Sequence, residues 1–100
     1  MTYVVVPSKR FLKIVKKFER GGRKDLLEAT EEAVHLLSIH DQRSLFVLGT
    51  RWHDHALTGN RKGIRELHLS LDDLLLYCVD GDTQKVELLD IVNHETLRRQ

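Results

Sequence analysis

Residues 64–92 read IRELHLSLDDLLLYCVDGDTQKVELLDIV, and this stretch decides the fold because it contains three apolar segments separated by turn residues. The first segment, 64–70, alternates in polarity, which is typical of a strand with one buried face. The second, 74–79, is apolar throughout, which indicates a central strand covered on both faces. The DGD triplet at 80–82 is typical of a hairpin turn, and 85–92 is the third strand. The stretch therefore predicts an antiparallel meander.

The residues before the meander predict a strand and a helix. Residues 2–6 are β-branched and apolar, which favours a strand, and Pro7 ends it. In residues 9–20 apolar side chains recur at helical spacing while lysines fill the other face, and Ser8 is a favourable N-cap. The glycine pair at 21–22 ends this helix.

A second helix is expected after the glycine pair, because Asp25 and Glu28 have the spacing of a capping box and an apolar stripe reaches Leu37. Two helices joined by so short a connection form a hairpin. A short C-terminal helix is expected at 94–100. The fold class is therefore α+β, with an N-terminal strand and a two-helix hairpin packed on a small, mainly antiparallel sheet.

The segment between the second helix and the meander allows more than one interpretation. Residues 44–49, SLFVLG, are either a short strand or an apolar segment pinned against the core. Residues 50–63, TRWHDHALTGNRKG, are expected to form a loop because Gly59, Asn60 and Gly63 favour turns.

Length and composition indicate a single domain over residues 1–100, with 41% hydrophobic and 31% charged residues, as in a soluble globular protein. The longest apolar runs are too short to span a bilayer, and no signal peptide is visible, so no membrane partner is expected. The single cysteine, Cys78, excludes an internal disulfide and fits the reducing cytoplasm, which is the expected location.

Positive charge is concentrated near the N-terminus although the net charge is only +1. Residues 9–24 carry eight cationic side chains and one acid, whereas the charged residues in 25–42 are all acidic. Segregation of this kind produces a positive face that attracts phosphate backbones. The alternative is that the two helices pair opposite charges with each other.

Titratable side chains crowd residues 53–73, which hold three of the six histidines. A metal site is one interpretation: His53 and His55 lie on one side of an extended segment, and Asp54 and His68 could complete the ligands. No ligand motif of known spacing appears, so acid/base chemistry without a metal or cofactor fits better.

Histidines that exchange protons near neutral pH suit the cleavage of RNA. One group takes the proton from a ribose 2′-OH, which attacks the adjacent phosphate, and another protonates the departing 5′-oxygen. The candidate proton-transfer groups are His55, His68 and His94. Asp72 is expected to orient one of them and Arg65 to face the phosphate, although alternation places Arg65 and His68 on opposite sides of their strand.

Some of these side chains also have a purely structural interpretation. His35 and His40, in the second helix, are assigned to structural roles, and Trp52 is expected to pack rather than to stack on a base. From periodicity alone, Asp72 and Asp73 form a turn between strands rather than a pair of catalytic carboxylates.

Four motifs, DHALTG, KGIRELHL, DDLLLY and NHETL, follow one another in an order and at a spacing that resemble the YafQ branch of the RelE superfamily of bacterial toxins. The resemblance is close over the second half of the chain; the first half matches in its layout of a strand and two helices. It implies the toxin half of a toxin–antitoxin pair, a ribosome-dependent mRNA endonuclease with a metal-free, histidine-rich active site and no cofactor.

The resemblance also assigns roles to residues. The implied catalytic set, assembled around the codon in the ribosomal A site, is His55, Glu66, His68, Asp72 and His94. Three positions depart from the family pattern: Glu66 stands where aspartate is usual, and Asp73 and Arg98 stand where aromatic residues are common. Arg98 could bind phosphate instead.

The partners implied by the resemblance are a cognate antitoxin that wraps the toxin with helices, mRNA, and the ribosome at its 30S A site. The first helix is expected to bind ribosomal RNA through phosphates, with Lys9, Arg10, Lys13, Lys16 and Lys17. The residues expected to bind the phosphates of the substrate RNA are Arg61, Lys62, Arg65 and Arg98. Two other functions stay open: a non-catalytic module of the same fold that binds RNA or protein, and a zinc-dependent hydrolase that uses His53 and His55.

Overall fold

The computed structural model describes residues 2–93, and within this range it contains five strands, three α-helices and one 3₁₀ turn. In chain order these elements are β1 (Val4–Pro7), α1 (Lys9–Arg20), α2 (Lys24–Ile39), α3 (Gln42–Arg51), β2 (His55–Ala56), η1 (Gly59–Arg61), β3 (Arg65–His68), β4 (Asp73–Asp80) and β5 (Lys85–Asn93). No helix in the described part of the chain has both the length and the apolar character needed to cross a membrane.

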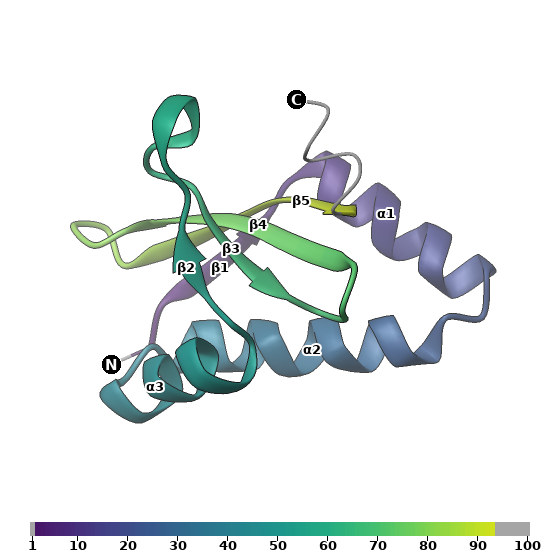
Figure 1. Cartoon of the computed structure of the whole chain (residues 1–100), viewed down its shortest axis with the longest axis horizontal. Coiled ribbons are helices and arrows are strands. Elements are labelled where there is room, and N and C mark those ends of the chain that lie inside the picture. The colour runs from purple at the N-terminus through teal and green to yellow at the C-terminus, as the bar shows by residue number, and fades with distance from the viewer. Residues whose placement is uncertain (1, 94–100) are drawn as a thin grey trace.

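The strands form one sheet with the order β1-β5-β4-β3-β2 (Figure 1). β1 runs parallel to β5, and each of the other neighbouring pairs is antiparallel. β3, β4 and β5 are the meander predicted from the sequence. The α+β class and the mainly antiparallel sheet are therefore confirmed.

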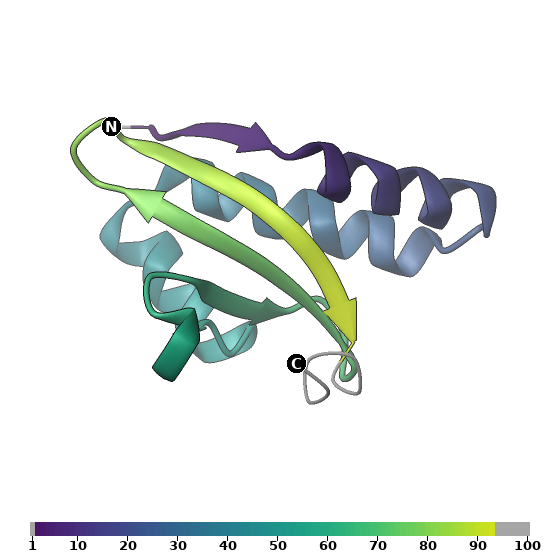
Figure 2. The ribbon, with the colours of Figure 1, turned by 90° about the horizontal axis from the view of Figure 1, so that it is seen from above.

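The helices cover one face of this sheet. α1 and α2 form the predicted hairpin, and α2 and α3 lie beneath the strands while α1 extends beside the end of β5 (Figures 1 and 2). Phe11, Leu26 and Leu48 from the helices pack with Leu75 and Leu88 from the sheet in one buried cluster. Burial of side chains of this size stabilises the fold by about 1.5–3 kcal/mol each.

The segment from 44 to 49 is part of helix α3, so the interpretation of it as a short strand is wrong. Asp41 caps α3: its carboxylate accepts from the Ser44 N–H at 2.7 Å, and the Ser44 hydroxyl oxygen accepts from the Asp41 N–H at 2.9 Å. Leu48 is fully buried whereas Phe46 is 69% exposed. These positions show an amphipathic helix that is pinned to the core along one side only.

The capping box predicted at the start of α2 is also wrong. Arg23 is the N-cap residue of α2, and its side chain makes no capping hydrogen bond. Asp25 instead accepts from the Arg23 guanidinium, with Nε and Nη2 at 3.1 and 3.0 Å. The sequence around 25–28 therefore met the spacing rule, but a neighbouring cation bound the carboxylate in place of the backbone.

Residues 50–63 are more ordered than the predicted loop, because they contain the end of α3, the strand β2 and the turn η1. The helix predicted at 94–100 lies outside the described residues.

A β-bulge in β5 positions α1 against the sheet. The register passes from Leu76 opposite Asp90 to Tyr77 opposite Leu88, so Leu89 is an extra residue. The Ser8 hydroxyl donates to the Leu89 carbonyl at 2.8 Å and accepts from the Phe11 N–H at 3.0 Å. One side chain therefore caps α1, as predicted, and ties that cap to the bulge.

Candidate active site

The face of the sheet opposite the helices collects three of the predicted catalytic residues. His55 in β2 pairs with Glu66 in β3, and His68 lies two positions further along β3. Paired residues share a face of the sheet, and so do alternate residues of one strand. Leu67, between Glu66 and His68, points the other way and is fully buried in the core. His55, Glu66 and His68 therefore lie together on the open face.

The ring of His55 has an acceptor at each nitrogen. Nε2 lies 2.8 Å from Oε1 of Glu66, and Nδ1 lies 2.7 Å from the carbonyl oxygen of His53. A neutral imidazole has only one N–H to donate. The two contacts are both hydrogen bonds only if the His55–Glu66 pair holds one proton more than a neutral ring and an ionised carboxylate would. A proton on this pair would therefore be shared between Nε2 of His55 and Oε1 of Glu66.

Glu66 is buried although it is a carboxylic acid. Its side chain is 8% exposed, whereas that of His55 is 50% exposed. Oε2 of Glu66 is buried and has no hydrogen-bond partner among the described residues. A buried carboxylate without a cation is costly, so His55 is the group that stabilises Glu66 in place.

A third histidine completes the cluster. The ring centroids of His53 and His68 lie 5.5 Å apart with an interplanar angle of 71°, and those of His55 and His68 lie 6.3 Å apart. The backbone N–H of His68 donates to the Trp52 carbonyl at 2.8 Å, which brings the two segments together. The sequence suggests His53 only as a metal ligand, because its place beside His68 depends on a left-handed backbone with φ of 52° that the sequence does not reveal.

Asp54 lies between two of these histidines but faces away from them. Its Oδ1 accepts from the Tyr77 hydroxyl at 2.6 Å and from Arg65 Nε at 3.3 Å. Burial raises the pKa of the Tyr77 phenol, and the hydrogen bond to Asp54 raises it further. Within residues 2–93 the structure contains no group of three or more His, Cys, Asp and Glu side chains arranged to hold a metal ion.

Arg65 shares this network rather than the histidine face. It pairs with Tyr77 across β3 and β4, so the two side chains lie on the face that packs against the helices. Burial by itself lowers the pKa of the Arg65 guanidinium, but hydrogen bonds to Tyr77 and Asp54 outweigh it, and the pKa is raised above its ordinary value. Arg65 and His68 therefore leave β3 on opposite sides, as the alternation predicted.

Asp72 and Asp73 lie at the turn between β3 and β4, as periodicity predicted. The Asp73 carboxylate accepts from the Ser70 hydroxyl at 2.7 Å, which closes the turn. Asp72 is exposed and its N–H donates to the Ser70 hydroxyl oxygen at 3.3 Å. Asp73, at the position where the family often has an aromatic side chain, is thus a structural part of the turn.

Two of the proposed phosphate-binding residues lie apart from the histidine cluster. Arg61 and Lys62 follow β2 in the loop that rises above the sheet in Figure 1, at the end of β3 remote from His68. His94 and Arg98 lie outside the described residues.

Two of the three side chains assigned to structural roles are packed, as predicted. Trp52 belongs to the buried core, and His35 is exposed on α2. His40 ends α2 and stacks on Tyr3, with ring centroids 3.9 Å apart.

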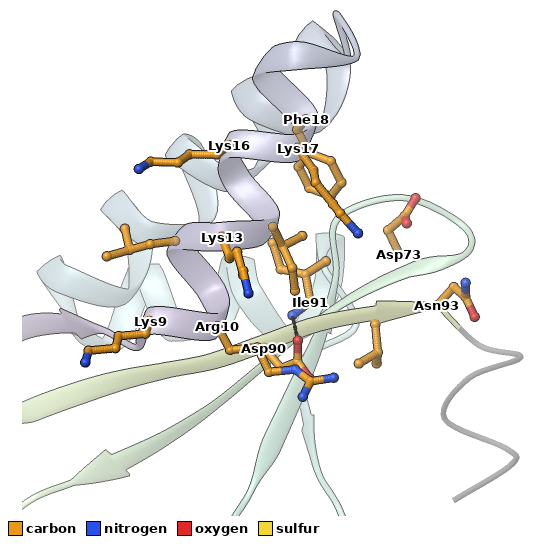
Figure 3. A pocket seen from close by; sticks show the side chains of 13 residues that line it. Lys9, Arg10, Lys13, Lys16, Lys17, Phe18, Asp73, Asp90, Ile91 and Asn93 are labelled. Carbon is orange, nitrogen blue, oxygen red and sulfur yellow. Dashed lines mark hydrogen bonds and ion pairs between the residues drawn. The ribbon is translucent and has the colours of Figure 1, made fainter.

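A groove of about 1000 Å³ lies between α1 and the end of β5 (Figure 3). Lys13 and Lys17 point toward β5, whereas Lys9 and Lys16 point away from it. Arg10 forms an ion pair with Asp90 of β5, with Nε and Oδ2 2.8 Å apart. The groove therefore has a basic rim contributed by the helix with the most cations.

The groove adjoins the face that carries the histidines. Strand pairing places His55, Glu66, Leu76 and Asp90 in one row across β2, β3, β4 and β5. At roughly 4.8 Å for each step between strands, Asp90 lies about 14 Å from His55. A single strand of RNA is long enough to reach from one surface to the other.

Comparison with known proteins identifies the family. The family model described as a bacterial toxin of type II toxin-antitoxin system, YafQ, matches residues 3–99. No curated protein sequence matches the chain. A solved structure of the DinJ–YafQ toxin–antitoxin complex from E. coli is 22% identical, with a TM-score of 0.74 over 97% of this chain and 98% of that chain.

Two structures from Helicobacter pylori are similar as well. A copper-bound mutant toxin is 26% identical, with a TM-score of 0.67, and the conserved hypothetical protein HP0892 is 27% identical, with a TM-score of 0.64. Each alignment covers 95% of this chain and 98% of the other. Because the family model spans nearly the whole sequence, the chain belongs to the YafQ family of bacterial toxins of type II toxin–antitoxin systems.

Proposed function

We propose that this toxin is a ribosome-dependent mRNA endonuclease that cleaves mRNA in the ribosomal A site without a metal and so inhibits translation. The observation that carries the proposal is the gathering of His53, His55 and His68 on one face of the sheet, with Nε2 of His55 2.8 Å from Oε1 of the buried Glu66. Membership of the YafQ family supports the toxin role, and ribosomes place the action in the cytoplasm.

The proposed reaction is an attack of the ribose 2′-oxygen on the adjacent phosphorus. His68 takes the proton of the 2′-OH, the bond between phosphorus and the 5′-oxygen breaks, and the His55–Glu66 pair gives its proton to that oxygen. The products are a 2′,3′-cyclic phosphate and a 5′-hydroxyl. Asp72 and His94 complete the proposed catalytic set.

The proposed phosphate contacts differ from those suggested by sequence. Arg65 forms an ion pair with Asp54 on the other face of the sheet. Its guanidinium is therefore proposed to stabilise the fold of the site and not to bind the phosphate. Arg61, Lys62 and Arg98 remain the proposed contacts to the substrate RNA. The cations of α1 are proposed to bind ribosomal RNA through its phosphates, and they are Lys9, Arg10, Lys13, Lys16 and Lys17.

We also propose a cognate antitoxin as the protein partner, by analogy with the DinJ–YafQ complex. The groove beside α1 offers apolar side chains such as Leu12, Phe18 and Ile91 below a basic rim. An acidic amphipathic segment is complementary to such a surface. An antitoxin bound there would also cover the cations proposed to bind the ribosome.

The experiment that tests the function is cleavage of mRNA on purified ribosomes, read by mapping RNA ends. The toxin should produce 2′,3′-cyclic phosphate ends only with ribosomes present, and equally well in a strong chelator. Intact mRNA on a ribosome that retains the toxin would support the alternative, a non-catalytic RNA-binding module built from the basic helix. Activity abolished by the chelator and restored by zinc would support the zinc-dependent hydrolase.

A further inference from the structure

The side chain of Asp54 is buried beneath the histidine cluster and is only 6% exposed. It receives hydrogen bonds from Tyr77 in β4 and from Arg65 in β3. Its backbone N–H donates to the Leu48 carbonyl of α3 at 3.0 Å. One residue therefore joins the segment that carries His53 and His55 to two strands and a helix.

The geometry of His55 depends on the backbone that Asp54 holds. The carbonyl oxygen of His53 is the acceptor for Nδ1 of His55, so its direction sets the tilt of the ring. His53 has a φ of 52°, in the left-handed region that residues other than glycine rarely adopt. A conformation of this kind persists only where neighbouring contacts hold it. The bonds of Asp54, the next residue, are contacts of that kind.

We propose that Asp54 is the positioning residue of the site: anchored by Tyr77 and Arg65, it fixes residues 53–55 so that the His53 carbonyl and Glu66 hold both nitrogens of His55. Asp54 touches no substrate, and its effect on cleavage rests on the proposed function. The same anchor gives the guanidinium of Arg65, whose side chain is 39% exposed, its role. Asparagine in place of Asp54 has the same shape but no charge. It would hold residues 53–55 less firmly, because hydrogen bonds to an ionised carboxylate are stronger than those to a neutral amide oxygen.

The test compares Asp54→Ala, Asp54→Asn and Tyr77→Phe with the wild type in two measurements. The first is the NMR spectrum of the His55 ring and its titration, which needs no substrate. The second is cleavage of ribosome-bound mRNA as a function of pH. Val86→Ala, which removes core volume on β5, three strands away from β2 in the sheet, is the control for a general loss of stability.

We expect Asp54→Ala to shift the His55 ring signals and their titration, and to lower kcat by about 10²-fold with little change in KM, as for a catalytic group displaced by about 1 Å. Asp54→Asn should restore part of the rate, since its amide oxygen still accepts from Tyr77. Tyr77→Phe should shift the same ring signals, and it serves where Asp54→Ala does not fold. Val86→Ala should leave kcat and the ring signals unchanged.

Ring signals of His55 that coincide with the wild type in Asp54→Ala or in Tyr77→Phe would overturn the proposal. So would an equal loss of kcat in Val86→Ala. A wild-type toxin that cleaves no RNA would refute the proposed endonuclease, while the NMR comparison would still decide whether Asp54 positions His55.

Discussion

The histidine face and the basic helix α1 differ in how their functional side chains are held. On the histidine face, Glu66 is 8% exposed and lies 2.8 Å from His55. Beneath that face, Asp54 is 6% exposed and accepts from the Tyr77 hydroxyl at 2.6 Å. On α1, Arg10 is 70% exposed and has one ion pair. One surface is fixed by buried polar bonds, and the other presents cations on a helix that solvent reaches.

This difference matches the distance requirements of two kinds of interaction, proton transfer and attraction between charges. Proton transfer requires atoms at hydrogen-bond distance, so a displacement of about 1 Å is costly. Attraction between lysines and phosphates acts over the Debye length, about 8 Å in physiological salt, and tolerates a mobile side chain. We therefore expect changes on the histidine face to alter the rate of the chemical step, and changes on α1 to alter affinity and its dependence on salt.

The largest effect is expected from His55→Ala. Removal of a general acid costs about 10²–10⁴-fold in rate, and this variant also leaves the buried Glu66 without its partner. Single-turnover cleavage on saturating ribosomes should fall by that factor while ribosome binding is retained.

His35→Ala is the matched control for this change, because it removes an exposed histidine from α2. It should cleave at the wild-type rate. A folded His55→Ala toxin with full activity would contradict the role given to the pair of His55 and Glu66.

The next largest effect is expected from the double variant Lys13→Gln, Lys17→Gln on the groove side of α1. The slope of log K against log salt is negative, and each lost phosphate contact should make it less steep by about 0.9. The double variant should therefore reduce the steepness by about two. Affinity for ribosomes should drop, whereas the single-turnover rate at saturation should not.

Lys24→Gln with Lys85→Gln removes the same charge from α2 and β5 rather than from α1, and is the control. A salt slope that changes equally in both double variants would show that net charge, rather than α1, attracts the ribosome. The measurement is a titration of labelled toxin at several salt concentrations.

Much of the fold follows from local sequence patterns. β4 and β5 are long apolar strands bounded by turn residues, and Ser8 and Gly21 begin and end α1 as expected. Helix α3 is not evident from the sequence because its apolar residues, 45–48, are consecutive and show no helical spacing, although Leu45 and Phe46 are exposed. The capping signal at Asp41 and Ser44 was present in the sequence, and it identifies the start of this helix.

The site was predictable only in part. Alternation along β3 places Glu66 and His68 on one face, and the family motif adds His55. The contact between Asp54 and Tyr77 joins residues 23 positions apart and depends on the register of three strands, which no local pattern gives. For the same reason, the sequence suggested that Arg65 faces the phosphate although its bonds lie beneath the sheet.

A smaller effect is expected from Ser8→Ala, which loosens α1 without touching the histidine face. Loss of an N-cap side chain costs about 0.5–2 kcal/mol in the free energy of unfolding, and the bond to the Leu89 carbonyl is lost as well. Chemical denaturation should show this loss, with an unchanged single-turnover rate. Ser38→Ala, whose hydroxyl donates to the His35 carbonyl within α2, should cost less. A Ser8→Ala toxin with slowed chemistry would show that the two surfaces are coupled.

The smallest effect is a dependence of stability on alkaline pH that originates beneath the histidine face. The pKa of Tyr77 is raised above its ordinary value of 10.0 by burial and by the bond to Asp54, so the folded state keeps the phenol proton after the unfolded chain has released it. The stabilisation is complete below pH 10 and is lost as the pH rises toward the folded-state pKa. The melting temperature of the wild type should therefore fall more steeply between pH 10 and 11 than that of Tyr77→Phe. Tyr3→Phe is the control and should follow the wild type, whereas parallel curves for wild type and Tyr77→Phe would show that Tyr77 ionises as freely as an exposed tyrosine.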